Sequence, residues 1–196
     1  MATELQLANS ALIKCGGRTI SSLTDTVKEA RTCNERFNDC RMAVLRAYPA
    51  SFAITRAKLT IVDAVPAYEY SSAFDLPEDF IRVVELNEGE EQYQLEGGRI
   101  LINADEVRLR YVWNYAGPQY PDPLWNEAFA LNLAWEISYT LTQSGELRDR
   151  LWEDYSKMLK LARFVNSTEG ARKAVSAEQF LDSRMTRGRF PRDPMT

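Results

Sequence analysis

The chain has 196 residues and a net charge of −4, with 45% hydrophobic and 27% charged residues, which is typical of a soluble globular protein with one compact domain or one domain and an added lobe. It contains no histidine, which excludes Ser-His-Asp and Cys-His catalytic arrangements but leaves carboxylate, lysine or tyrosine chemistry open. No apolar run approaches the ~18 residues of a membrane-spanning helix, so we expect no membrane partner.

Two helices are predicted at the start of the chain. The first should begin after Thr3, a good N-cap residue, and end at the glycine pair 16–17, because glycine readily adopts the left-handed conformation of a helix end. The second should have Thr24 or Asp25 as its N-cap and stop at the Tyr-Pro pair 48–49. Its apolar residues recur every three or four positions, which indicates one buried stripe.

Cysteine spacing predicts core residues. Cys33 and Cys40 are seven positions apart and share one helix face, and Cys15 makes the number of cysteines odd. We therefore predict three small buried residues in a reducing compartment, not a disulfide or a redox pair. The charged residues of the second helix fall mostly off its stripe and should face solvent or a neighbour: Arg31, Glu35, Arg36, Asp39 and Arg41.

A β region is predicted between residues 53 and 116. The segment FIRVVEL (80–86) is rich in β-forming residues, and VRLRYVW (107–113) alternates apolar and polar side chains. The segment YQLEGGRILIN (93–103) is typical of a hairpin closed by the glycine pair 97–98. We expect one antiparallel sheet of roughly four to six strands.

Two more helices are predicted after the β region. Asp122-Pro123 is typical of an N-cap followed by proline at the first helical position. The third helix is apolar enough to be central, and Ser144-Gly145 separates it from a fourth helix, which fades in the segment NSTEG (166–170).

The C-terminal segment differs from the body in charge. Residues 171–196 carry six Lys and Arg against three acidic residues, a net charge of +3, which leaves −7 in residues 1–170. The segment also lacks clean periodicity. We expect an interaction arm that is extended or poorly ordered in the isolated subunit.

Together these elements predict an α+β protein. The expected fold is a four-helix antiparallel bundle with a small antiparallel β lobe inserted between helices 2 and 3, and an extended C-terminal arm. The expected boundaries are 1–52 for helices 1 and 2, 53–116 for the β lobe, 117–169 for helices 3 and 4, and 170–196 for the arm.

One carboxylate cluster could carry chemistry. Asp75, Glu78 and Asp79 lie close together in the sequence DLPEDF, and paired carboxylates can act as acid and base or hold a divalent ion. A carbohydrate hydrolase would need two of them about 5–10 Å apart across a cleft. The simpler interpretation is a turn in which Pro77 fixes the backbone and Asp79 accepts local N–H bonds.

Two further clusters suggest contacts. Glu88, Glu90 and Glu91 form an acidic turn, either a solvated loop tip or a contact with a basic neighbour. A set of aromatic residues surrounds the crossing from the sheet to the third helix; it either seals the seam between two lobes or stacks on a sugar or base. Its members are Trp113, Tyr115, Tyr120 and Trp125.

The arm has two candidate partners. Short basic tails bind nucleic-acid phosphates, but an acidic body repels a duplex. A protein partner fits at least as well, with a phenyl ring as anchor and arginines as charge-assisted donors. The candidate residues are Arg184, Arg187, Arg189, Phe190 and Arg192.

Two stretches of the chain carry a family resemblance. They are LANSALIKCGGRTISSLTDTVKEARTCNERFNDCRMAVLRAYPASFA (7–53) and YEYSSAFDLPEDFIRVVEL (68–86). Their order of a short helix, an I-SL turn, a long helix, an FA element and an aromatic strand with LP-DF-R resembles tail tubular protein A, the head-to-tail adaptor family of short-tailed bacteriophages. Tyr48-Pro49 stands where that family often has Trp. The matching residues are Gly16, Gly17, Ile20, Ser22, Leu23, Phe52, Ala53, Tyr70, Leu76, Pro77, Asp79, Phe80 and Arg82.

The resemblance implies a virion structural protein without catalytic residues, metal or cofactor, made in the host cytoplasm. Such adaptors form a twelve-membered ring that joins the portal protein to the tail nozzle protein, and genomic DNA passes through the ring without specific binding. The arm residues Arg184, Arg187, Arg189, Phe190 and Arg192 would then contact the portal, and Glu88, Glu90 and Glu91 the nozzle or a neighbour. The alternatives are a carbohydrate hydrolase using Asp75, Glu78 and Asp79, and a nucleic-acid-binding module using the arm.

Overall fold

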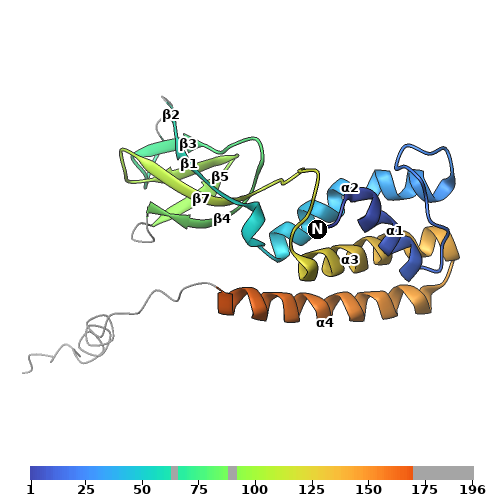
Figure 1. Ribbon diagram of the computed structural model, residues 1–196. Coiled ribbons are helices and arrows are strands. Elements are labelled where there is room, and N and C mark those ends of the chain that lie inside the picture. Colours follow the sequence, from blue (N-terminus) through green and yellow to red (C-terminus); the bar gives the residue numbers. More distant parts are fainter. Residues whose placement is uncertain (63–65, 88–91, 170–196) are drawn as a thin grey trace, which may run out of the picture.

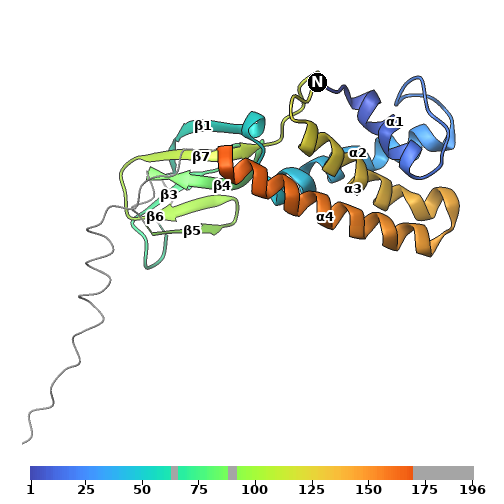
Figure 2. The same cartoon turned by 60° about the horizontal axis from the view of Figure 1, so that its bottom comes forward.

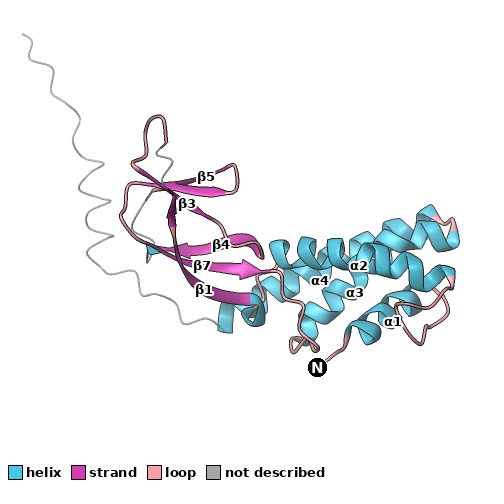
Figure 3. Cartoon of the chain, turned by 90° about the horizontal axis from the view of Figure 1, so that it is seen from above, coloured by secondary structure: helices cyan, strands magenta, loops and turns pink. Residues whose placement is uncertain are grey.

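The computed structural model describes residues 1–62, 66–87 and 92–169. The helices gather in one lobe and the strands in another, and the two lobes lie side by side in an elongated subunit (Figure 1). The chain begins in the helical lobe, crosses to the β lobe after the second helix and returns before the third (Figure 3).

The first helix, α1 (Glu4–Lys14), begins and ends as predicted. The Thr3 side chain accepts a hydrogen bond from the Gln6 amide, and the Gln6 side chain accepts one from the Thr3 amide, which together form a capping box. At the other end, Gly16 has a φ of 70°, a conformation that glycine adopts without strain.

The second helix, α2 (Lys28–Ala47), ends where the Tyr-Pro pair predicted, but its predicted N-cap is wrong. The helix begins without a side-chain cap. The Asp25 carboxylate accepts hydrogen bonds from the amides of Ser21 and Ser22 instead, at 3.1 and 2.9 Å. Asp25 thus stabilises the preceding loop, and Thr24 does not cap the helix either.

The last two helices are α3 (Pro123–Thr142) and α4 (Gly145–Glu169). As predicted, Asp122 caps α3: its Oδ1 accepts hydrogen bonds from the amides of Leu124 and Trp125. In two views α4 runs alongside α3, with its C-terminal end at the side of the β lobe (Figures 1 and 2).

The helical lobe is organised around α3. The helices α1, α2 and α4 each pack against α3 and make few contacts with one another, and a helix that is apolar on all sides belongs at the centre. No helix in the described ranges is both long and apolar enough to cross a membrane. The three cysteines Cys15, Cys33 and Cys40 are buried here as free thiols, which confirms that they are core residues.

The described residues of the β lobe form seven strands in two antiparallel sheets, ordered β1-β7-β4 and β2-β3-β6-β5. A short 3-10 helix, η1 (Ser51–Ala53), leads into them. The strands are β1 (Ile54–Leu59), β2 (Ile61–Val62), β3 (Ser72–Asp75), β4 (Phe80–Leu86), β5 (Tyr93–Glu96), β6 (Arg99–Ile102) and β7 (Val107–Trp113).

The two sheets pack on a core that is separate from the helical one. Leu109 and Tyr111 of the three-stranded sheet meet Phe74 and Ile100 of the four-stranded sheet in this core. The predicted hairpin joins β5 to β6, and both of its glycines, 97–98, have positive φ, as a tight two-residue turn requires.

The prediction of a four-helix antiparallel bundle with one small β lobe is wrong, although the chain is a mixture of helices and strands. The described residues form four α-helices and seven strands in two sheets, and three helices surround α3 instead of closing a four-cornered bundle. In the β lobe, the difference from the prediction arises at one position in the chain. The chain leaves one sheet after Leu59 and enters the other at Ile61, so two sheets form where one was expected.

Candidate interaction surfaces

A buried arginine joins the two lobes. Arg41 of α2 is only 7% exposed. Its guanidinium donates hydrogen bonds to Glu4 Oε1 at 3.2 Å, Asn38 Oδ1 at 2.6 Å, Asn114 Oδ1 at 3.1 Å and the Tyr120 hydroxyl at 3.4 Å. One side chain therefore connects α1, α2 and the segment that returns from the β lobe.

The groups around Arg41 offset the energetic cost of burying its charge. A buried charge is unfavourable unless it is paired and hydrogen-bonded, and here one of the four acceptors is a carboxylate. Burial raises the pKa of the Tyr120 hydroxyl, so this group stays neutral. It accepts a hydrogen bond from Arg41 and donates one to Glu4 Oε1 at 3.3 Å, which closes the network.

Three further arginines hold the end of α2. The last carbonyls of a helix have no partner inside the helix. Arg82 of β4 donates to the carbonyl of Arg46 at 3.2 Å, and Arg163 of α4 donates to that of Ala47 at 2.9 Å. Arg46 itself donates to the carbonyl of Ile81 in β4 at 2.7 Å. These charge-assisted bonds fix both β4 and α4 to the negative end of the α2 dipole.

An aromatic column runs through the same junction. Tyr120 and Trp125 stack with ring centroids 5.0 Å apart, and Tyr115 lies edge-on between Tyr120 and Trp113. This arrangement confirms that these four residues seal the seam between the lobes. Phe52 belongs to the column as well, since its ring contacts Tyr115, Tyr120 and Trp125. It was not among the aromatic residues predicted for this seam.

The carboxylates of DLPEDF have separate environments. Asp75 pairs with Arg99 at 3.0 Å at the surface, while Asp79 Oδ1 accepts a hydrogen bond from the Tyr111 hydroxyl at 3.0 Å and Glu78 is exposed. Burial, followed by the bond to Asp79, raises the pKa of Tyr111 to about 12. No His, Cys, Asp or Glu cluster in the described ranges is arranged to hold a metal. The predicted turn is present, with a phenol as the partner of Asp79.

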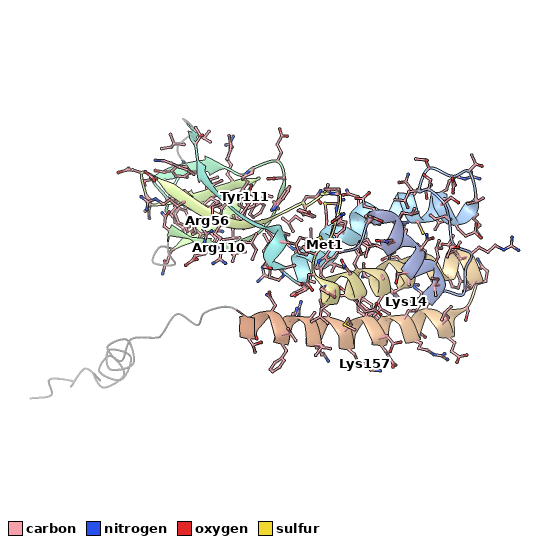
Figure 4. All side chains as sticks on the ribbon, viewed as in Figure 1. Met1, Lys14, Arg56, Arg110, Tyr111 and Lys157 are labelled. Atoms are coloured by element: carbon pink, nitrogen blue, oxygen red, sulfur yellow. The ribbon has the colours of Figure 1, made fainter. Side chains whose placement is uncertain are left out.

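The outer surface of the three-stranded sheet is basic. Arg56 of β1 lies directly opposite Arg110 of β7, and Lys58 lies opposite Arg108. All four alternate with core residues along their strands, and we call them the cationic face. Figure 4 shows Arg56 and Arg110 together on the β lobe.

Two carboxylates partly neutralise the cationic face. Glu85 pairs with Arg110 at 3.3 Å, and Glu106 pairs with Lys58 at 2.7 Å and Arg108 at 3.0 Å. The hydrogen bonds from Lys58 and Arg108 lower the pKa of Glu106. Within the described residues the fourth cation, Arg56, forms no ion pair. Four cations therefore share two carboxylates.

The outer surface of the four-stranded sheet holds a groove of about 530 Å³. Tyr68, Glu69, Gln94 and Glu96 line it, and all four are exposed. The cation at this groove, Arg99, is already paired with a carboxylate of β3. Among the described residues, Glu69 and Glu96 form no ion pair. We therefore call Tyr68, Glu69, Gln94 and Glu96 the acidic groove.

The helix α4 presents apolar side chains to solvent near its C-terminal end. It buries only one narrow stripe, Leu151, Tyr155 and Ala162, among its described residues. Leu161 and Phe164 lie outside this stripe and are 49% and 67% exposed. Exposed apolar residues that gather on one element suggest a contact surface.

The remaining predicted contact residues lie outside the described residues. They are Glu88, Glu90 and Glu91, and the arm residues Arg184, Arg187, Arg189, Phe190 and Arg192.

The burial of Arg41 could have been predicted from its position in the sequence. It stands four residues after Phe37 and three before Val44, which are both buried, so it lies on the apolar stripe of α2. A charge at such a position indicates a buried partner. The prediction for Arg41 was solvent or an unnamed neighbour, and the structure supplies the neighbours.

No family model matches the chain, and no curated protein matches it. The resemblance to tail tubular protein A therefore remains a prediction from the quoted stretches.

Proposed function

We propose that the chain is a virion structural protein of a short-tailed bacteriophage, a head-to-tail adaptor whose ring joins the portal to the tail nozzle. The proposal begins with the resemblance of residues 7–53 and 68–86 to that family. Twelve copies would surround a channel for the genomic DNA. The chain would act through its surfaces and would bind no cofactor.

The observation that best supports this proposal is the locked junction between two lobes with different outer surfaces. Arg41, Arg46, Arg82 and Arg163 all bond across elements at this junction, and the aromatic column fills it. Hydrogen bonds from so many elements, together with stacked rings, oppose bending of one lobe against the other.

A ring subunit needs this combination. Each copy must present two different complementary faces to its neighbours at a fixed angle, or the ring does not close. It must also keep other surfaces for the proteins above and below. Here the β lobe supplies charged faces, and the helical lobe supplies the apolar end of α4.

The proposed contacts follow from these surfaces. The exposed Leu161 and Phe164 lie shortly before the arm in the chain, so we assign both the arm and this end of α4 to the portal. The basic residues of the arm would supply charge-assisted hydrogen bonds there. Glu88, Glu90 and Glu91 would meet the nozzle or a neighbouring copy.

Electron microscopy of the full-length chain mixed with the portal ring from the same phage genome tests the proposal. We expect an added coaxial layer with an open centre. The chain alone should elute as a monomer or a weak oligomer in size-exclusion chromatography, because the portal nucleates the ring. A portal that gains no layer would overturn the proposal, whether or not the chain associates with itself.

A further inference from the structure

The β lobe carries opposite charges on its two outer surfaces. The cationic face covers the three-stranded sheet, and the acidic groove lies on the four-stranded sheet. The two sheets pack on a shared core through their inner surfaces, so the two charged surfaces point away from each other. Among the described residues, the side chains of neither surface make a hydrogen bond or ion pair with the helical lobe.

The cationic face sets like charges opposite each other, and its two carboxylates offset them only in part. Like charges directly opposite each other on neighbouring strands destabilise a sheet, and two such pairs, Arg56 with Arg110 and Lys58 with Arg108, follow one another here. Local conflicts of this kind are most often found at functional sites. An acidic partner placed over this face would remove the conflict.

The acidic groove has charges that complement those of the cationic face. Glu69 and Glu96 are exposed at its rim, and Tyr68 beside them is 78% exposed. Exposed aromatic rings and arginines are enriched where proteins meet. The groove therefore offers carboxylates for a guanidinium and a ring against which its plane can stack.

We propose that the cationic face of one copy docks on the acidic groove of the next copy, so that the subunits associate head to tail through their β lobes. This inference rests on the proposed ring and names the surfaces that build it. Because the two faces differ, the contact is heterologous and closes into a ring when the rotation between copies permits it.

A second copy fits the cationic face better than a nucleic acid does. The region 53–116 contains six basic and twelve acidic residues, so its net charge of −6 repels a polyanion that approaches from a distance. A neighbouring copy brings only its local carboxylates, and the chain itself carries both halves of the contact.

Two double charge reversals test the inference in the full-length chain. Arg56→Glu with Lys58→Glu makes the cationic face acidic, and Glu69→Lys with Glu96→Lys makes the acidic groove basic. Sedimentation velocity at rising concentration should show association at least about tenfold weaker for each variant alone, because like charges then face each other. An equimolar mixture should recover association, since every contact in an alternating assembly again joins opposite charges.

A matched control separates these faces from total charge. Arg18→Glu with Lys157→Glu reverses two exposed cations of the helical lobe; Figure 4 shows Lys157 on α4, away from the β lobe. This variant should associate like the unchanged chain. Circular dichroism of all variants checks that they fold.

The inference would be overturned if both β-lobe variants associated as strongly as the unchanged chain, or if both added the same layer to the portal. The proposed function would survive that result. Binding of a labelled DNA duplex that is lost with Arg56→Glu and Lys58→Glu, while association persists, would also overturn it and assign the face to DNA. Conversely, charge-dependent association without any layer on the portal would refute the proposed function and leave the inference intact.

Discussion

Arg41 in the helical lobe donates a hydrogen bond from Nε to Oδ1 of Asn114 at 3.1 Å, directly after the last strand of the β lobe. The backbone N–H of Asn114 donates a hydrogen bond to the backbone carbonyl of Asp79 at 2.8 Å. Asp79 directly precedes β4. The same arginine pairs with Glu4. One buried guanidinium thus links α1 and α2 to the segment that leaves the β lobe.

Replacing this arginine should destabilise the fold. Arg41→Met removes the donor that Glu4, Asn38 and Asn114 share, and loss of one partner from a buried charged network costs about 3 kcal/mol. Urea unfolding followed by circular dichroism measures the change. Arg36→Met, at an exposed position of the same helix, should change the free energy of unfolding by less than about 0.5 kcal/mol. Equal effects of the two variants would contradict the role assigned to Arg41.

Stability should fall at alkaline pH because of the buried thiols. Burial raises the pKa of Cys15 to about 11 and those of Cys33 and Cys40 to about 12, from an ordinary thiol value of 9.0. Above pH 9 the unfolded chain releases these protons while the folded chain keeps them, so the free energy of unfolding decreases as pH rises from 9 towards 11. The maximum slope is about 1.4 kcal/mol per pH unit for each thiol.

Urea unfolding at pH 8 and at pH 10 measures this slope. Cys33→Ala removes one of the three thiols, and we expect a shallower decline than in the unchanged chain. A free energy of unfolding that is constant between the two pH values would show that the thiols are accessible in the folded state.

The cap of α3 should contribute measurably to stability. Asp122 accepts hydrogen bonds from two amides of the first turn and, through Oδ2, from the Tyr48 hydroxyl at 2.8 Å. Asp122→Ala should cost about 1–2 kcal/mol, and Asp122→Asn should cost less because asparagine also caps helices well. Thermal unfolding compares them with Asp105→Ala, a change at an exposed loop residue. An Asp122→Ala variant as stable as Asp105→Ala would argue against the cap.

Replacing each of the two aspartates of DLPEDF by asparagine should change stability by different amounts, and this difference distinguishes a structural role from a catalytic one. Asp79→Asn weakens the bond to the Tyr111 hydroxyl and should lower stability by about 1 kcal/mol. Asp75→Asn breaks an exposed pair with Arg99 and should change it by less than about 0.5 kcal/mol. Glycan hydrolysis by the unchanged chain that disappears in folded Asp79→Asn would instead support the hydrolase alternative.

Removal of the arm tests the portal contact. A chain that ends at Gly170 retains all the described residues, so we expect an unchanged unfolding transition. It lacks Arg184, Arg187, Arg189, Phe190 and Arg192, and we expect it to add no layer to the portal ring in electron microscopy. Normal attachment of the shortened chain would refute the arm as the portal contact.

The sequence by itself determined most of the local structure. Helix ends at Thr3, Gly16 and Asp122, and the hairpin turn at 97–98, were predictable because capping and turn formation depend on residues only a few positions apart. Burial of Cys33 and Cys40 followed from their spacing on one helix face. The predicted N-cap role of Asp25 was wrong, because its carboxylate accepts hydrogen bonds from two backbone amides of the preceding loop instead.

Only the tertiary structure decided how these elements combine. Alternation in β1 and β7 showed which side chains share a face, but not that Arg56 would stand opposite Arg110, because strand register depends on partners about 50 residues away in the chain. Likewise, the stripe of α2 did not reveal that Arg41 would meet acceptors from two other segments, α1 and the segment that returns from the β lobe. Pairing between distant residues is set by the packing of whole elements, and no local pattern encodes it.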